Sequence, residues 1–439
     1  MSDTLRVEST SLPEALARIL TLLPSDRPQS ESVALDESLG RTLARDLLSP
    51  IDVPAYTNSA MDGYAFRGEE LAGEGTLELA VAGESLAGHP CSHEIPPGSA
   101  LHVMTGGLVP EELDTVIPFE KVEEMPGRIR FARDAVKPGA NVRHKGEELR
   151  TGDAALRRGE RITPAHVGLA ASLGYAELPV ERIVRAAVFA TGDEVREPGR
   201  PLGEGELYNA NGHSLTAQLR AWGADVTNLG ILPDDPDRME AVLREAARTH
   251  DLLLTSGGVG AGEKDFTSLV LSRLGTVTHL HVSMRPGKPL TFGTIETEGR
   301  RVLFLGLPGN PVAALLSARL FVRPVLDGLA GSRPVEVPLL RATAATNVRS
   351  RPGRTEFVRG TLERRGEELF FTPYATQSSA LLTTLTECNA CALIEETAGS
   401  VPAGRPVAVF FLCSLIRRRP SSDGAPSDVA PNARRSPRA

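Results

Sequence analysis

Three motifs in the middle of the chain place glycines beside acidic or polar side chains directly after predicted strands. They are VFATGDE at residues 188–194, TSGGVGAGEKD at residues 255–265 and LPGNPVAA at residues 307–314. In an open parallel sheet the carboxyl ends of the strands line a common crevice, which is where ligands bind. We therefore expect the three motifs to face one pocket.

The second motif has the composition of a phosphate-binding loop. Ser256, Gly257 and Gly258 begin a glycine-rich turn whose backbone N–H groups can converge on an anion, and a helix predicted to start near Lys264 adds the positive end of its dipole. The motif is neither a Walker A loop nor a GxGxxG dinucleotide fingerprint. The alternative interpretation is a purely structural turn.

Carboxylates beside a phosphate loop repel the ligand unless a divalent cation lies between them, and Mg2+ is the usual cation. Asp234 follows another predicted strand and is a further functional candidate. Asp235 precedes Pro236 and a periodic helix, so we expect it to cap that helix. The candidate acids next to the loop are Asp193, Glu194 and Asp265.

A stiff turn carries two cations. The segment MRPGKPLTFG, residues 284–293, places Arg285 and Lys288 between prolines and a glycine after a predicted strand. Cations mounted rigidly in this way are suited to an oxyanion. The alternative is a solvated turn charge. Lys288 is one of only five lysines, against 43 arginines, so it is the cation that we would change first.

A second group of polar residues lies in the first third of the chain. The segment PAYTNSAMDGYA, residues 54–65, contains Asn58, Ser59 and Asp62. A predicted strand ends in Thr105, Gly106 and Gly107, and the loop NVRHKGEE contains Arg143. Because functional groups concentrate on loops held by a rigid scaffold, we expect these loops to present a second set of ligand-binding groups.

The helices and strands that are expected to position these groups change in type along the chain. Leu12, Leu16, Ile19 and Leu23 recur on one face and predict an amphipathic helix over residues 11–24. Residues 62–140 are rich in Gly and Pro with short alternating runs, which is typical of a small β domain. From residue 181 to about 327, short apolar strands alternate with helices, as a parallel sheet with crossover helices requires. A β-rich block follows.

These patterns predict a multidomain protein of the α/β plus β class, with segments 1–26 (N-terminal helix), 51–144 (β-rich domain), 181–328 (α/β domain), 329–415 (C-terminal β domain) and 416–439 (disordered tail).

Composition excludes several function classes. The 48 basic and 56 acidic residues give a net charge of −8, so nothing draws the surface toward nucleic acid. No apolar run is long enough for a signal peptide or a membrane span, and we therefore expect a cytoplasmic protein with no membrane contact. Cys388 and Cys391 form a single CxxC pair without further ligands, for which we predict a structural role and no zinc site.

Eight motifs in order along residues 5–415 closely resemble the MoeA family of molybdopterin molybdenumtransferases, which is related to the E domain of gephyrin and to its plant counterpart. They are NSAMDGYA, MTGGLVPEELDTV, NVRHKGEE, ATGDE, SGGVGAGEKDF, MRPGKP, GLPGNPVAA and GRTEFVRG. The resemblance implies a homodimer of four-domain subunits: a mostly parallel molybdopterin-binding α/β domain, a C-terminal β-barrel-like domain, a small β-rich domain and a linking N-terminal domain formed by residues 27–50 and 145–180. It also implies that the N-terminal helix packs on the α/β domain.

The resemblance further implies an activity: with Mg2+, the enzyme inserts molybdenum from molybdate into adenylylated molybdopterin and releases AMP. By position, the family's functional acids are Asp62, Glu194, Asp234 and Asp265, of which Glu194 and Asp265 are the implied Mg2+ ligands. The implied substrate-binding residues are Thr105, Gly106, Arg143, Ser256, Gly257, Gly258, Asn310 and Pro311. The implied molybdate-binding residues are Arg285, Lys288, Arg354, Arg359 and Ser379.

The chain departs from the family pattern at three positions. Arg285 stands where the family has lysine, Ala380 where glycine is usual, and Glu148 where aspartate is preferred. Two other functions stay open: a molybdopterin adenylyltransferase, which shares the SGGVG loop, and a gephyrin-like scaffold. The partners that we expect are a second copy of the chain, the adenylyltransferase and proteins that deliver the cofactor to molybdoenzymes.

Overall fold

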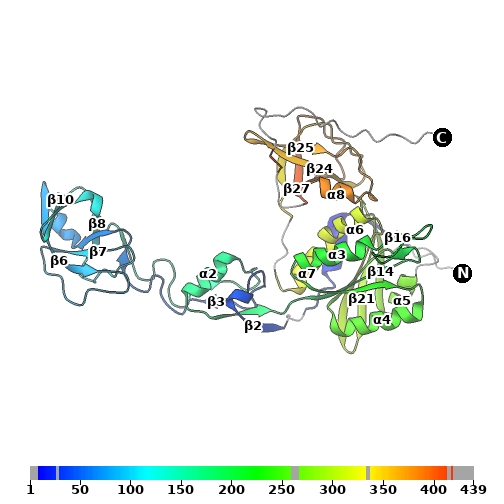
Figure 1. The fold of residues 1–439 in the computed structure, drawn as a ribbon, viewed down its shortest axis with the longest axis horizontal. Coiled ribbons are helices and arrows are strands. Elements are labelled where there is room, and N and C mark those ends of the chain that lie inside the picture. The colour runs from blue at the N-terminus through cyan, green and yellow to red at the C-terminus, as the bar shows by residue number, and fades with distance from the viewer. Residues whose placement is uncertain (1–7, 26–28, 259–265, 333–336, 413–416, 419–439) are drawn as a thin grey trace. The chain divides into compact units, whose positions relative to one another are not determined.

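The computed structural model describes residues 8–25, 29–258, 266–332, 337–412 and 417–418, which fall into two compact units (Figure 1). Unit 1 contains residues 1–29 and 181–439, and unit 2 contains residues 30–180. None of the helices within the described ranges is both long and apolar enough to cross a membrane.

A seven-stranded sheet forms the centre of unit 1, in the order β1-β19-β21-β22-β18-β14-β17. Strands β17, β14, β18 and β22 are mutually parallel, whereas β21 is antiparallel to both β22 and β19. The sheet is therefore mixed, with a parallel core. The bounds are β1 (Glu8–Thr10), β14 (Arg185–Thr191), β17 (Asp225–Leu232), β18 (Leu252–Ser256), β19 (Gly275–Val282), β21 (Pro289–Thr297) and β22 (Arg300–Leu307).

Helices cover both faces of this sheet (Figure 1). One core packs side chains of α1, α3, α6 and α7 against the sheet, and the other packs α4 and α5 against the opposite face. Strands β14, β18 and β22 are buried along nearly their whole length and are mostly apolar, as burial on two faces demands, whereas the edge strand β17 exposes Asp225 and Thr227. The helices are α1 (Leu12–Leu20), α3 (Ala210–Ala221), α4 (Pro236–Thr249), α5 (Phe266–Leu274), α6 (Pro311–Ser317) and α7 (Arg323–Leu329), with the π-helix η4 (Ala318–Val322) between the last two.

The N-terminal helix is shorter than the predicted range 11–24. Helix α1 ends at Leu20, and residues 21 and 22 form a turn. Ser11 caps the helix by accepting a hydrogen bond from the Glu14 backbone N–H at 3.4 Å. The fully buried Ala15 and Ile19 pack into the core that contains α7. The apolar stripe thus finds its partner surface within unit 1.

A closed five-stranded barrel follows the α/β part of unit 1. Its strands pair in the ring β24-β25-β23-β27-β26, and β26 returns to β24. The strands are β23 (Leu340–Ala344), β24 (Thr355–Arg365), β25 (Glu368–Pro373), β26 (Ala390–Ile394) and β27 (Pro406–Phe411), with the short helix α8 (Thr383–Glu387) before β26. The predicted disordered tail, 416–439, lies outside the described residues except for β28 (Arg417–Arg418), which pairs with β24.

Strand β20 (Met284–Arg285) connects the barrel to the α/β sheet within unit 1. It runs parallel to the start of β24, with Arg285 in register with Glu356. The Thr355 N–H also donates to the Ser283 carbonyl at 2.9 Å. The turn that was predicted to carry oxyanion-binding cations is therefore built into the barrel wall.

Unit 2 contains a six-stranded sheet in the order β8-β5-β7-β6-β10-β9. These strands are β5 (Gly63–Phe66), β6 (Thr76–Ser85), β7 (Ser99–Val103), β8 (Thr115–Pro118), β9 (Glu123–Met125) and β10 (Arg128–Ala132). A separate small core joins helix α2 (Pro164–Ser172) to the ladders β3–β12 and β2–β13. The bounds are β2 (Ser30–Ala34), β3 (Leu47–Leu48), β12 (Ala154–Leu156) and β13 (Glu177–Glu181).

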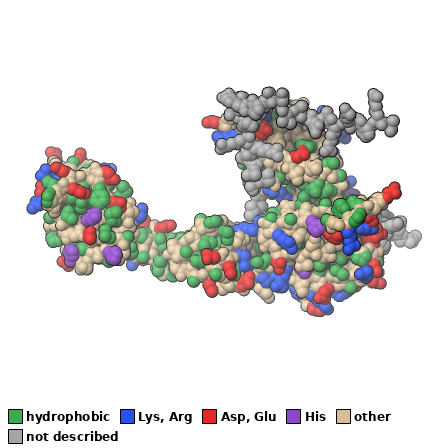
Figure 2. Space-filling view, in the orientation of Figure 1, with side chains coloured by type: hydrophobic (Ala, Val, Ile, Leu, Met, Phe, Trp, Pro, Cys, Tyr) green, Lys and Arg blue, Asp and Glu red, His purple; other side chains and the backbone are tan. Residues whose placement is uncertain are grey.

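Acidic and basic side chains are interspersed on the visible face of each unit (Figure 2). This mixture agrees with the composition, which gives no large field of one sign to attract a polyanion.

Candidate active site

Carboxylates gather at the ends of two neighbouring parallel strands, β14 and β17. Gly192 follows β14 with a φ of 127°, which turns the chain so that Asp193 and Glu194 are exposed. Burial raises the pKa of Asp234, and the charges of Asp193 and Glu194 raise it further. Because charges act in this way only at short range, the three acids share one region. The structure thus brings together the predicted Glu194 and Asp234.

Two other acids in this region have separate outcomes. Asp235 caps α4, as predicted, because its Oδ1 accepts from the N–H groups of Asp237 at 3.1 Å and Arg238 at 3.2 Å. Asp265 lies outside the described residues, together with Lys264 and the rest of the segment 259–265. Its predicted role as an acid and Mg2+ ligand stays a prediction.

The glycine turn after β18 leaves no room for a side chain at Gly258. Gly257 and Gly258 have φ angles of 91° and 61°, which favour glycine. A Cβ at Gly258 would lie 2.5 Å from the Thr191 hydroxyl and 2.8 Å from the Thr267 hydroxyl. The backbone of Gly258 is exposed, so its surface is available to a ligand that approaches closely.

Ser256 begins this turn, but its hydroxyl is already engaged within the protein. It donates to the Pro308 carbonyl at 3.1 Å and accepts from the Asn211 amide Nδ2 at 2.7 Å. The side chain is also 4% exposed. Ser256 therefore holds the strand-end loops together, and any direct contribution to a ligand comes from backbone groups of the turn.

Asn211 is a site residue that sequence reasoning missed. It lies in the first turn of α3, and its Nδ2 donates to Ser256 and, at 2.7 Å, to the Gly309 carbonyl. Its Oδ1 is buried without a hydrogen-bond partner. One amide thus joins the loops after β18 and β22. The only sequence signal was a second asparagine in the segment NAN, where Asn209 already supplies the helix cap.

The loop after β22 presents Asn310 and Pro311 at the start of α6. Asn310 is exposed and occupies the N-cap position without a side-chain cap bond, so its amide is available to a ligand. Gly309 approaches Gly257, since a Cβ on Gly309 would lie 3.7 Å from the Gly257 Cα. The predicted convergence of the strand-end motifs on one edge of the sheet is confirmed for the residues that the structure describes.

The basic residues meet where β20 joins the barrel. Arg354 donates to Glu356 Oε1 from Nε at 3.0 Å and from Nη2 at 2.9 Å. Arg285 Nη1 lies 3.8 Å from the same oxygen. Glu356 is buried, and sequence reasoning did not single it out. This carboxylate orients two of the predicted molybdate-binding cations and offsets part of their charge.

Arg359, Ser379 and Lys288 extend this basic region. Arg359 is 2% exposed, and its Nη2 donates to the Ser378 carbonyl at 3.0 Å. Burial lowers the pKa of Arg359, and the charge of Arg285 lowers it further, so the two guanidinium groups are neighbours. The Ser379 carbonyl accepts from Val312 N–H at 3.1 Å, which connects this loop to α6. Lys288 is exposed on the turn.

Unit 2 holds the second predicted group of polar residues. The Asp62 Oδ1 accepts from both the N–H and the hydroxyl of Thr105 at 2.7 Å. These hydrogen bonds hold the pKa of Asp62 below its usual value. The Gly106 N–H donates to the Ser59 carbonyl at 2.8 Å. The loop carrying Asp62 is thus fixed against the loop that ends β7.

Arg143 lies beside this group on a short ladder. Strand β11 (Val142–Arg143) pairs with β4 (Asn58–Ser59), and Arg143 is opposite Asn58. A cavity of about 470 Å3 is lined by Val53, Pro54, Asn58, Arg143, Glu147 and Glu148. The Asn58 Oδ1 is buried without a hydrogen-bond partner. Glu148, at the position where the family prefers aspartate, lines the same cavity.

A glycine turn and carboxylates lie at the ends of parallel strands, and guanidinium groups lie on a barrel of the same unit, an arrangement typical of multidomain α/β proteins that bind anions. Comparisons with known proteins make the class specific. Three family models match: the MoeA N-terminal region (domains I and II) at residues 10–174, the probable molybdopterin-binding domain at 187–328, and the MoeA C-terminal region (domain IV) at 341–412.

Similar proteins span nearly the whole chain. A molybdopterin molybdenumtransferase of Haemophilus influenzae is 38% identical over 403 residues, which cover 91% of this chain and 98% of that protein. One of Nostoc is 32% identical, with 90% and 92% covered. Two crystal structures of a molybdopterin biosynthesis MoeA protein from Pyrococcus horikoshii also match, and both are covered completely. The first has a TM-score of 0.72 at 30% identity and covers 93% of this chain. The second has a TM-score of 0.77 at 26% identity and covers 92% of this chain.

The chain belongs to the MoeA family of molybdopterin molybdenumtransferases, and it is an enzyme of molybdenum cofactor biosynthesis.

Proposed function

We propose that this enzyme inserts molybdenum from molybdate into adenylylated molybdopterin and releases AMP in a Mg2+-dependent step. The observation that carries the proposal is the juxtaposition, at one edge of the unit 1 sheet, of the Gly257–Gly258 turn with Glu194 and Asp234. A phosphate group suits the turn, and a cation suits the acids. The guanidinium groups of Arg285, Arg354 and Arg359, in the same unit, supply the charge that an oxyanion requires.

The donor set fits Mg2+. Burial raises the pKa of Asp234, and the charges of Asp193 and Glu194 raise it further, so a cation beside these acids would be favourable. Mg2+ prefers oxygen ligands and takes one or two protein carboxylates together with substrate phosphates. Within the described ranges, no three His, Cys, Asp or Glu side chains form a cluster that could hold a metal ion. We propose Glu194 and Asp265 as its ligands. When bound, Mg2+ would neutralise charge on the phosphoanhydride.

The protein groups have separate tasks in this proposal. The backbone N–H of Gly258 binds the phosphate, because the Gly257 N–H already donates to the Leu307 carbonyl at 3.1 Å, and Ser256 fixes the turn. Asn310 and Pro311 bind the substrate beside that turn, and Asp234 orients the reacting groups. Thr105, Gly106, Arg143 and Asp62 form the separate ligand-binding group of unit 2. Arg285, Lys288, Arg354, Arg359 and Ser379 hold molybdate near the dithiolene. Positioning and charge stabilisation supply the catalysis, and no covalent nucleophile takes part.

The test uses the full chain with adenylylated molybdopterin and Mg2+. We expect AMP release that molybdate stimulates, and no such release from Glu194→Ala or Asp265→Ala at unchanged oligomeric state. Asp237→Ala, an exposed acid on α4, is the matched control and should retain turnover. Molybdate-independent AMP release would contradict the proposal. Formation of adenylylated molybdopterin and pyrophosphate from ATP and molybdopterin would favour an adenylyltransferase. Loss of the oligomer in the site variants would assign these acids a structural role.

We also propose that the enzyme works as a homodimer and that it exchanges cofactor with the adenylyltransferase and with delivery proteins for molybdoenzymes. Family membership supports this assembly. Sedimentation of the purified chain tests it, and a monomeric enzyme with full turnover would contradict it.

A further inference from the structure

Gln377 lies in the loop between β25 and α8, directly before Ser378 and Ser379. Its side-chain amide makes three hydrogen bonds, all of them to main-chain groups. Oε1 accepts from the Arg359 N–H at 2.9 Å, and Nε2 donates to the carbonyls of Arg359 and Tyr374, each at 2.9 Å. One half-buried side chain thus fastens this loop to β24 at Arg359.

The Gln377 amide lies where two strands of the barrel separate. The β24–β25 ladder has its last pair at Gly360 and Pro373, and beyond it the Tyr374 N–H still donates to the Arg359 carbonyl at 2.8 Å. The Arg359 N–H and the Tyr374 carbonyl both bond to the Gln377 amide. A primary amide has a donor and an acceptor side by side, as a peptide group does, so it satisfies both main-chain groups. Gln377 therefore takes the place of a strand residue at this point.

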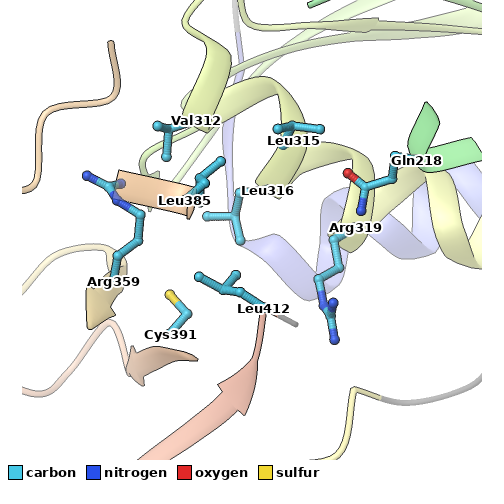
Figure 3. A pocket seen from close by; sticks show the side chains of 9 residues that line it. All are labelled: Gln218, Val312, Leu315, Leu316, Arg319, Arg359, Leu385, Cys391 and Leu412. Carbon is cyan, nitrogen blue, oxygen red and sulfur yellow. The ribbon is translucent and has the colours of Figure 1, made fainter. Parts of the chain in front are cut away.

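Two further hydrogen bonds hold the rest of this loop. The Ser378 carbonyl accepts from Arg359 Nη2 at 3.0 Å, and the Ser379 carbonyl accepts from the Val312 N–H of α6 at 3.1 Å. Arg359 also lines a cavity of about 140 Å3 in unit 1, and Figure 3 shows its side chain extending from the barrel beside Leu385 of α8. The loop is therefore fixed between the barrel and the start of α6.

We infer that Gln377 is a positioning residue of the oxyanion site, and this inference rests on the proposed function. Its amide sets the path of the main chain from which the side chains of Arg359 and Ser379 project. Groups that bind a ligand must be held within about 0.5 Å of their productive positions, so release of this loop costs affinity for the oxyanion. Gln377 acts through Arg359 and Ser379 and takes no direct part in the chemistry.

Asn389 provides a matched control on the same strand. Its Oδ1 accepts from the Leu362 N–H at 2.7 Å, and its Nδ2 donates to the Leu362 carbonyl at 3.1 Å. Leu362 lies further along β24 than Arg359 and belongs to the barrel core. Loss of either amide leaves main-chain groups of β24 without their partner and destabilises the barrel. Only the loss of the Gln377 amide also releases the loop that carries Ser379.

The test compares Gln377→Met with Asn389→Leu in the full chain, since each change replaces an amide by an apolar side chain of similar size. For Gln377→Met we expect the KM for molybdate in AMP release to rise about tenfold, with kcat at saturating molybdate within about twofold of wild type. Calorimetry with molybdate alone should show the same loss of affinity, and hydrogen exchange of residues 378–382 should be faster. Asn389→Leu should lower the Tm and leave the KM for molybdate and this exchange unchanged. Gln377→Asn, whose amide is one methylene too short, is the second variant and should also raise the KM.

A wild-type KM for molybdate in both Gln377 variants would overturn the inference. An equal rise in KM for Asn389→Leu, at a matched loss in Tm, would make the effect one of barrel stability and would overturn it as well. Unchanged exchange of residues 378–382 in Gln377→Met would mean that the amide does not hold the loop. Absence of molybdate binding to the wild-type chain would instead contradict the oxyanion site of the proposed function. Because the exchange measurement contains no substrate, it then still decides whether Gln377 orders the loop.

Discussion

Arg354 donates two hydrogen bonds to a single oxygen of Glu356, from Nε at 3.0 Å and from Nη2 at 2.9 Å. A buried carboxylate therefore sits among the cations proposed to bind molybdate. It holds Arg354 in one orientation and competes, as an anion, for the charge that the substrate needs. Both effects can be separated by substitution.

Glu356→Gln retains an oxygen that accepts from Arg354 but removes the negative charge. We expect oxyanions, sulfate included, to bind about tenfold more tightly, which corresponds to about 1.4 kcal/mol. Sulfate should therefore inhibit turnover more strongly. Isothermal titration with molybdate and sulfate measures this change. Glu356→Ala is the comparison: it also loses the grip on Arg354, so molybdate turnover should fall. Equal oxyanion affinity in wild type and Glu356→Gln would refute the competition.

Asn211→Ala removes both hydrogen bonds that join the loops after β18 and β22. Each such bond contributes about 1 kcal/mol, so kcat/KM should fall by about 10- to 100-fold, mainly through KM for adenylylated molybdopterin. Steady-state kinetics measures this loss. Asn211→Asp should lower kcat/KM to the same extent, because a carboxylate cannot donate to the Gly309 carbonyl. Ser256→Ala combined with Asn211→Ala should cost less than the sum of the two changes.

Asp234→Asn should stabilise the protein and abolish turnover. The pKa of Asp234 is raised in the folded state, so the folded state binds more protons than the unfolded state above the ordinary aspartate pKa of 3.8. Stability is therefore lost as pH rises from about 4 through the raised pKa, and the ionised acid is unfavourable at pH 7.

We expect Asp234→Asn to raise the Tm by about 1–3 °C at pH 7 without Mg2+. The difference should vanish near pH 3, where the wild-type acid is protonated as well. Differential scanning calorimetry at both pH values provides the check. A lower Tm for Asp234→Asn at pH 7 would mean that the carboxylate has a stabilising partner in the fold.

Gly258→Ala places a Cβ against the hydroxyls of Thr191 and Thr267, at a φ of 61°. We expect a loss of about 1–3 kcal/mol in the free energy of unfolding of unit 1 and weaker AMP binding, because the turn must shift. Urea unfolding and AMP titration measure the two effects. Gly168→Ala in helix α2 is the control, since a Cβ there meets nothing within 4 Å. It should be neutral or slightly stabilising. Wild-type AMP affinity in Gly258→Ala would argue against a phosphate at this turn.

Local patterns in the sequence predicted the sheet of unit 1 and the positions of several candidate site residues at its strand ends. The alternation of apolar strands with helices from residue 181 predicted the sheet, because periodicity and caps depend on neighbours in the sequence. The same alternation placed Glu194, Asp234 and the Gly257–Gly258 turn at strand ends, and the carboxyl ends of parallel strands necessarily share one edge. Helix α1 was predicted too long because its apolar stripe continues to Leu23, which packs beside Gly328 from outside the helix.

Only the tertiary structure decided how the polar groups are used. The bonds of Asn211 join positions 45 and 98 residues away, and a helix or strand period contains no record of such pairs. In the folded chain the Ser256 hydroxyl bonds to Asn211 and Pro308, so it connects loops of the protein. Glu356 lies beside Arg354, one of the predicted oxyanion-binding cations. Folding also closed a cavity between Arg319 and Arg359, residues of the α/β part and the barrel. The residue types present in the site followed from the sequence, whereas the partners that each residue keeps followed from long-range packing.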